Sequence, residues 1–212
     1  MSPYSKPAHR SEFFRPPPAI ALFVVVLLVV GVVTGALAIR TMDHGEKDDL
    51  VGYLDVFLRG LARDPAAANA GEVWRLAALN HGRTALALWF LGLTIIGSPL
   101  IAVIVFVRGF ILGFTVGFFV QELGYRGVML ATAAVLPSNL LAVPAFILLA
   151  VMALTFSTGL IRARPSRSME LARRVLAYSL LCLALTAGLL LAGVVEAYVS
   201  PVFIRLASRF WP

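Results

Sequence analysis

The ten residues from Arg108 to Gly117, RGFILGFTVG, decide the fold class of this chain. Their glycines, Gly109, Gly113 and Gly117, recur at every fourth residue between large apolar side chains. Because an α-helix has about 3.6 residues per turn, this spacing puts the three glycines on one face. A face of small residues lets a second helix approach closely in lipid, so the stretch predicts a packed membrane helix.

The glycine ridge has two alternative partners. Gly31 and Gly35 repeat the spacing in the first apolar stretch of the chain, which favours packing between two helices of the same molecule. The other alternative is a seam between subunits, in a homo-oligomer or with a different membrane protein. The sequence leaves both alternatives open.

The composition extends this prediction to the whole chain. Of 212 residues, 60% are hydrophobic and 14% are charged, whereas soluble domains have about 45–50% apolar and about 25% charged residues. The fold class predicted is all-α, a polytopic transmembrane helical bundle. The net charge of +7 comes from arginines that flank apolar runs, without interleaved aromatic residues. We therefore expect no nucleic-acid binding.

The apolar runs predict a single membrane domain over residues 19–200 with about five membrane-crossing segments. The regular apolar helix at 109–121 would be only about 20 Å long. We therefore expect broken or short helices over 109–139, with a re-entrant hairpin as the alternative to a crossing. The spans are expected at 19–39, 84–107, 109–136 (irregular), 139–160 and 175–198.

The placement of arginines predicts which side each connection occupies. Residues 1–18 form a short basic tail, and residues 161–174 hold five arginines against one glutamate. Because positive residues are enriched in cytoplasmic loops, we expect the N-terminus and this loop in the cytoplasm. The nearly neutral loop at 40–83 should lie outside. Residues 201–212 should form an interfacial tail, and Glu196 should lie near the interface.

The outer loop shows helical amphipathicity. Its apolar side chains recur at helical spacing, and a second short helical stretch presents a tryptophan. These residues either cap the bundle at the membrane surface or bind an outside partner. The candidate partner-binding residues are Leu50, Leu54, Phe57, Leu61 and Trp74.

Polar residues and prolines at membrane depth form a second group of candidates. Arg108 and Glu122 bracket the short helix, and Pro137, Ser138 and Asn139 suggest a break in the next one. Lipid tolerates broken backbone only where protein or a wet cavity surrounds it. The charged pair either reaches the interface or lines a polar path, and the Ser-Asn pair either caps a helix or binds a ligand.

The sequence lacks the motifs that are typical of catalytic and metal-binding sites. No GxSxG, HExxH or phosphate-binding loop occurs in a suitable context. The single cysteine, Cys182, and three separated histidines lack the spacing of metal ligands. We therefore expect no enzymatic activity, no catalytic residues, no metal site and no cofactor.

Three segments carry a family resemblance. They are RGFILGFTVGFFVQELGYRGVMLATAAVLPSNLLAVPAF at Arg108–Phe146, EKDDL at Glu46–Leu50 and WFLGLTIIGSPLI at Trp89–Ile101. Over roughly residues 15–200 the chain resembles stage II sporulation protein M of endospore-forming bacteria. The resemblance implies a non-enzymatic scaffold in the bacterial cell membrane, at the sporulation septum and engulfing membrane. Its implied partners are stage II sporulation proteins D and P, which degrade peptidoglycan during engulfment of the forespore.

An alternative function follows from the residues alone. A channel or transporter for ions or small solutes would use broken helices around Arg108, Glu122 and Asn139. It requires these polar groups to share one path through the bundle. A scaffold requires only helix surfaces that fit partner helices and that contact the surrounding lipid bilayer.

Overall fold

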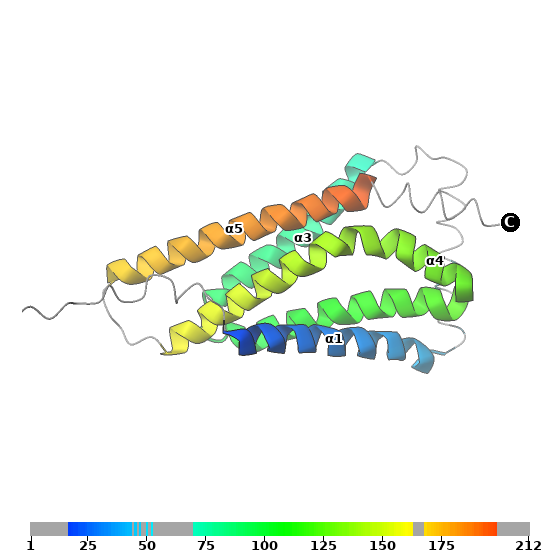
Figure 1. Cartoon of the computed structure of the whole chain (residues 1–212), viewed down its shortest axis with the longest axis horizontal. Helices are drawn as coiled ribbons and strands as arrows, with labels where there is room; N and C mark the ends of the chain where they lie inside the picture. Colours follow the sequence, from blue (N-terminus) through cyan, green and yellow to red (C-terminus); the bar gives the residue numbers. More distant parts are fainter. Residues whose placement is uncertain are drawn as a thin grey trace, which may run out of the picture.

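Four helices, α1, α3, α4 and α5, account for most of the described residues (Figure 1). The structure, a computed structural model, describes residues 17–43, 45, 47, 50, 52, 70–162 and 168–198. The helices are α1 (Pro18–Thr41), α3 (Ala70–Gly92), α4 (Gly97–Arg162) and α5 (Ser168–Tyr198). No strand occurs in these residues, so the predicted all-α membrane bundle is confirmed.

Helix α4 reverses direction at Gly124 and runs back along itself (Figure 1). Gly124 has φ 55° and ψ −131°, a backbone conformation that side chains rarely allow. Beyond the turn, a methyl group on Gly127 would overlap the carbonyl oxygen of Phe119, so the two arms meet closely. We call residues 97–123 the first arm, residues 125–162 the second arm, and this end of the bundle the reversal end.

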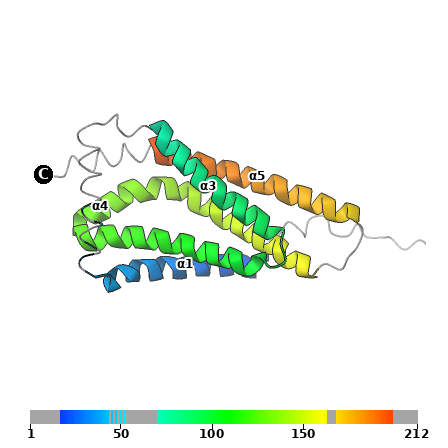
Figure 2. The same ribbon diagram turned by 180° about the vertical axis from the view of Figure 1, so that it is seen from behind.

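The number of membrane spans differs from the prediction. Within the part of the chain that the structure describes, four segments and not five are long and apolar enough to cross a membrane: Pro18–Thr41, Gly97–Tyr125, Val135–Leu160 and Leu171–Tyr198. Helix α3 also runs along the bundle, beside α5 (Figures 1 and 2). It is less apolar than these four segments because it carries Glu72, Arg75, His81 and Arg83.

The predicted span at 84–107 is wrong, because the chain turns back within it. Helix α3 ends at Gly92 and α4 begins at Gly97. At this turn the Thr94 hydroxyl donates to the Leu91 carbonyl at 2.8 Å, and Gly97 packs directly against that carbonyl. Pro99 does not interrupt a helix but lies in the first turn of α4, where a missing N–H leaves no helical bond unmade.

The break predicted within 109–139 is confirmed, but it lies at Gly124, after a full-length helix and not a short one. The helix continues from Gly97 through Arg108 to the turn at Gly124, so it is a full-length span and not a 13-residue fragment. Pro137 and Pro144 lie inside the helical second arm. Prolines are tolerated in membrane helices when neighbouring groups take over the lost hydrogen bonds. The two prolines therefore do not break the helix. The break lies at Gly124, the only glycine with a positive φ among the described residues.

Aromatic and polar side chains pack between α3, the second arm and α5. The Tyr178 ring stacks on Phe156, with centroids 4.4 Å apart, and its hydroxyl lies 3.2 Å from the Trp89 carbonyl. The buried Ser157 hydroxyl donates to the Thr94 carbonyl at 2.8 Å. These polar contacts fix the turn between α3 and α4 against the second arm.

Substituting Gly124 with alanine tests the reversal. We expect a loss of about 1–3 kcal/mol in the free energy of unfolding, because a Cβ is strained at this φ and ψ. Gly82→Ala is the matched control, since nothing lies within 4 Å of a Cβ at Gly82 in α3. The control should gain about 0.5–1 kcal/mol. Thermal unfolding in detergent measures both, and equal shifts would contradict the described turn.

Candidate functional site at the reversal end and in the bundle interior

Helix α1 packs against the first arm of α4 through five buried glycines, which we call the glycine seam. A methyl group on Gly31 would overlap the Phe106 carbonyl oxygen, and one on Gly113 would overlap the Val32 carbonyl oxygen. The two backbones are therefore in direct contact. The members of the seam are Gly31, Gly35, Gly109, Gly113 and Gly117.

The glycine ridge of α4 packs against a helix of the same molecule. The ridge of Gly109, Gly113 and Gly117 faces α1 of the same chain, against Leu28, Val32 and Ala36. The ridge is therefore covered and unavailable as a subunit seam. The opposite face of α1 exposes large apolar side chains, as expected of a lipid-facing helix at the edge of the bundle.

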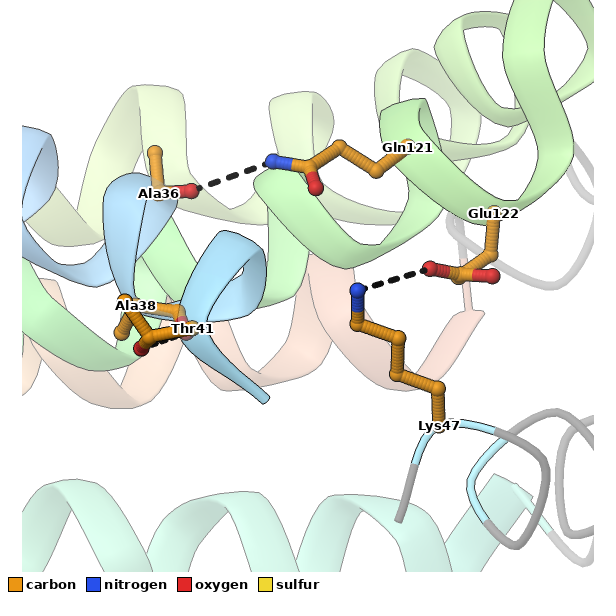
Figure 3. Close-up of polar contacts among 6 residues, drawn as sticks. All are labelled: Ala36, Ala38, Thr41, Lys47, Gln121 and Glu122. Carbon is orange, nitrogen blue, oxygen red and sulfur yellow. Dashed lines mark hydrogen bonds and ion pairs between the residues drawn. The ribbon is translucent and has the colours of Figure 1, made fainter. Parts of the chain in front are cut away.

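Two polar contacts fasten the reversal end (Figure 3). The Gln121 amide donates to the Ala36 carbonyl of α1 at 3.4 Å. The Lys47 ammonium lies 4.0 Å from the Glu122 carboxylate, and both residues are half-buried. The end of the first arm is thus tied both to α1 and to the chain that follows α1.

The Lys47–Glu122 pair should contribute little to stability. Partly solvated ion pairs typically contribute about 0.2–1 kcal/mol. We expect Glu122→Gln to cost less than about 1 kcal/mol, and the double variant with Lys47→Met to cost less than the two single losses added together. A double-mutant cycle on unfolding in detergent measures this coupling. Strict additivity would show that the pair does not interact.

Three ionisable side chains, from α3, α4 and α5, lie near one another, and of these His81 is buried and Glu196 is partly exposed. The Arg108 guanidinium carbon lies 5.9 Å from the centre of the Phe146 ring, which suits a cation–π contact. The carboxylate of Glu196 attracts this guanidinium. The same carboxylate lies 3.6 Å from Nε2 of the buried His81. Glu196 thus lies close to His81 of α3 and within electrostatic reach of Arg108 of α4.

Sequence reasoning placed Glu196 at the interface and gave His81 no role. The partnership joins residues that are far apart in the sequence, so no local pattern could reveal it. One signal was available, because Glu196 is an acidic residue within an otherwise apolar span and Arg108 is the opposite charge within another. Ionisable residues inside membrane proteins usually pair with one another.

The predicted polar candidates do not gather in one site. Arg108 contacts Phe146, whereas Glu122 faces Lys47. The Asn139 amide donates to the Val135 carbonyl of its own helix at 2.8 Å. Pro137 lies within the second arm, and Ser138 is buried. These residues therefore fix separate parts of the bundle.

The predicted partner-binding residues of the outer loop are described only in part. Leu50 is half-buried, and Trp74 is exposed on α3. Leu54, Phe57 and Leu61 lie outside the described residues, as do most of the basic tail, the centre of the arginine-rich loop and the C-terminal tail. The roles given to these segments stay predictions.

Comparison with known proteins assigns the family. No curated protein and no solved structure matches this chain. Residues 24–201, however, match the family described as stage II sporulation protein M. This range includes most of α1, all of α3, α4 and α5, and the whole glycine seam. The chain therefore belongs to the stage II sporulation protein M family and is a sporulation-related membrane protein with several apolar, span-length helices.

Proposed function

We propose that this chain is a non-enzymatic membrane scaffold of the sporulation engulfment complex. It recruits or anchors the peptidoglycan-degrading stage II sporulation proteins D and P while the septal membrane migrates around the forespore. The observation that carries the proposal is the set of contacts that the polar candidate residues make. Arg108, Glu122 and Asn139 contact groups of the same molecule, so the bundle offers its surroundings helix surfaces.

Transport is supported less well. A channel needs polar groups that share one path, yet the three residues on which that hypothesis depends contact three different neighbours. Arg108 and Glu122 are also separated along the first arm by about 21 Å of helix. A scaffold needs no such path.

The order of the helices supports an orientation for this scaffold. The start of α1, the end of α4 and the start of α5 lie at one end of the bundle (Figure 1). The basic tail, residues 1–18, precedes α1, and the arginine-rich loop, residues 161–174, joins α4 to α5. We therefore place this end of the bundle, with the N-terminus, in the cytoplasm. The reversal end then faces the peptidoglycan side of the septal membrane, where the partners act.

Co-purification tests the proposal. The chain should co-elute in mild detergent with stage II sporulation proteins D and P when all three are co-expressed. Gly113→Val, which breaks the glycine seam, should lose this association. Gly188→Ala should keep it, because a Cβ at Gly188 meets only an ordinary contact at 3.7 Å. Separate elution of folded, co-expressed partners from the unaltered chain would contradict the scaffold.

A further inference from the structure

The buried face of α3 carries a histidine among apolar side chains. Ala77, His81, Ala85 and Leu88 are buried at four- and three-residue spacing, so they lie on one face of the helix. Among the buried residues described for α3, His81 is the only one with a polar side chain, and it is 3% exposed. Its imidazole therefore faces the interior of the bundle and not the solvent.

Helix α5 provides the surroundings of this imidazole. A Cβ at Gly193 would lie 3.5 Å from Cδ2 of His81, so the ring packs on the backbone of α5. About one turn further along α5, a carboxylate oxygen of Glu196 lies 3.6 Å from Nε2 of His81. Gly193 and Glu196 lie on the same face of α5, where the glycine leaves room for the ring beside the carboxylate.

The ring nitrogen that faces Glu196 lacks a hydrogen bond. Nε2 of His81 is buried and has no hydrogen-bond partner among the described residues. At 3.6 Å from the carboxylate it is too far for a hydrogen bond but within the range of an ion pair. A buried nitrogen without a partner is unfavourable, whereas a positive charge at this nitrogen would face a negative one. The site therefore suits the protonated ring.

Glu196 also has a positive neighbour in a third helix. The guanidinium of Arg108 in α4 is attracted to the same carboxylate, and arginine stays charged at physiological pH. A carboxylate has about four acceptor sites, and the side chain of Glu196 is 46% exposed to solvent, so it can receive a second cation. On α3 itself the nearest charged residue, Arg83, is exposed.

We propose that His81 and Glu196 form a proton-dependent contact that fastens the N-terminal half of α3 to α5. Histidine is the side chain whose charge ordinarily changes between about pH 5 and 8. When the ring gains a proton, the contact becomes an ion pair, so protonation and helix packing favour each other. The contact should therefore strengthen as the pH falls through this range and weaken as it rises.

The other half of α3 is held by groups that do not titrate in this range. The Trp89 indole donates to the Ser179 hydroxyl at 3.0 Å, and the Tyr178 hydroxyl lies 3.2 Å from the Trp89 carbonyl. Loss of the proton would loosen residues 70–81, which follow the outer loop, and leave the end of α3 in place. The contact belongs to the isolated chain, so it goes beyond the proposed scaffold and does not depend on it.

Amide hydrogen exchange of the full-length protein in detergent tests the proposal, because it follows residues 70–81 and 83–92 of α3 separately. The unaltered chain and His81→Gln are compared at about pH 5.5 and about pH 8.5, on either side of the histidine range. At the lower pH we expect residues 70–81 to exchange about 5-fold more slowly in the unaltered chain, as for a partly solvated ion pair. This difference should shrink at the higher pH, and residues 83–92 should show none.

Two control variants identify the proton site and its partner. Glu196→Gln keeps the imidazole but removes the carboxylate, so residues 70–81 should behave as in His81→Gln at both pH values. Because Glu196 is partly exposed, this variant tests the contact even if His81→Gln does not fold. Replacing His9 and His44 with glutamine removes the other two histidines of the chain and should leave the pH dependence unchanged.

Three results would overturn the proposal. They are a difference from His81→Gln that does not change with pH, slower exchange of residues 70–81 at the higher pH, and full pH dependence in Glu196→Gln. None of them affects the scaffold, because no partner protein is in the sample. Conversely, separate elution of stage II sporulation proteins D and P would contradict the scaffold and leave this contact standing.

Discussion

Replacing Gly113 with valine should separate α1 from α4 and destabilise the chain by at least about 3 kcal/mol. The new Cβ would overlap the Val32 carbonyl oxygen and lie 2.6 Å from its carbon. Both are backbone atoms that cannot rotate away, so the whole helix must shift. Overpacking a rigid site typically costs about 1–3 kcal/mol, and here the shift also removes close contacts along the rest of the seam.

Thermal unfolding in detergent measures this loss, with Gly188→Ala as the control. A Cβ at Gly188 in α5 would lie 3.7 Å from the Ala145 side chain, an ordinary contact. The control should be neutral or slightly stabilising, because alanine favours a helix more than glycine does. Similar unfolding temperatures for both variants would contradict backbone contact at the seam.

Truncating Tyr178 to alanine should have the second large effect, a loss of about 3 kcal/mol. Its buried ring stacks on Phe156 and covers Gly92, so removal leaves a cavity where three helices meet. Aromatic truncations in packed interiors typically cost about 3–5 kcal/mol. Tyr178→Phe keeps the ring and should cost only about 0.5–1.5 kcal/mol, the contribution of one hydrogen bond.

The exposed Leu180 supplies the control for the tyrosine. It lies two residues away on α5 and is 59% exposed, so Leu180→Ala should change stability by less than about 0.5 kcal/mol. The fluorescence of Trp89, whose indole donates to the neighbouring Ser179, can report unfolding in detergent. A comparable loss for both variants would show that Tyr178 is not a packing centre.

The sequence predicted what depends on local periodicity. Glycines spaced by four lie on one helix face whatever the rest of the chain does, and Gly31, Gly35, Gly109, Gly113 and Gly117 lie in close contact. Apolar runs likewise predicted the all-α membrane bundle. What periodicity could not give was the partner of each face, because that depends on how distant helices are arranged.

Chain breaks were harder to predict because proline and glycine act differently in lipid. Pro137 suggested a break but lies inside a helix, as does Pro144, and surrounding protein can satisfy the freed carbonyls there. Gly124, which does break the helix, is one of 17 glycines and has no distinctive neighbours. The apolar run at 84–107 hid a turn because both helices that it joins are apolar there.

The charged residues show the same limit. Arg108 was recognised as unusual from its apolar surroundings, but its attraction to Glu196 depends on the packing of α4 beside α5. Arg83 was counted as part of a loop, since α3 begins polar and ends apolar. The structure places it within α3, which packs against α5.

Imaging in sporulating cells tests the scaffold most directly. Fluorescent fusions of stage II sporulation proteins D and P are followed in cells that contain or lack this chain. We expect both fusions to gather at the septum and to follow the engulfing membrane only when the chain is present. Unchanged enrichment of both proteins in its absence would contradict a role in recruiting or anchoring them.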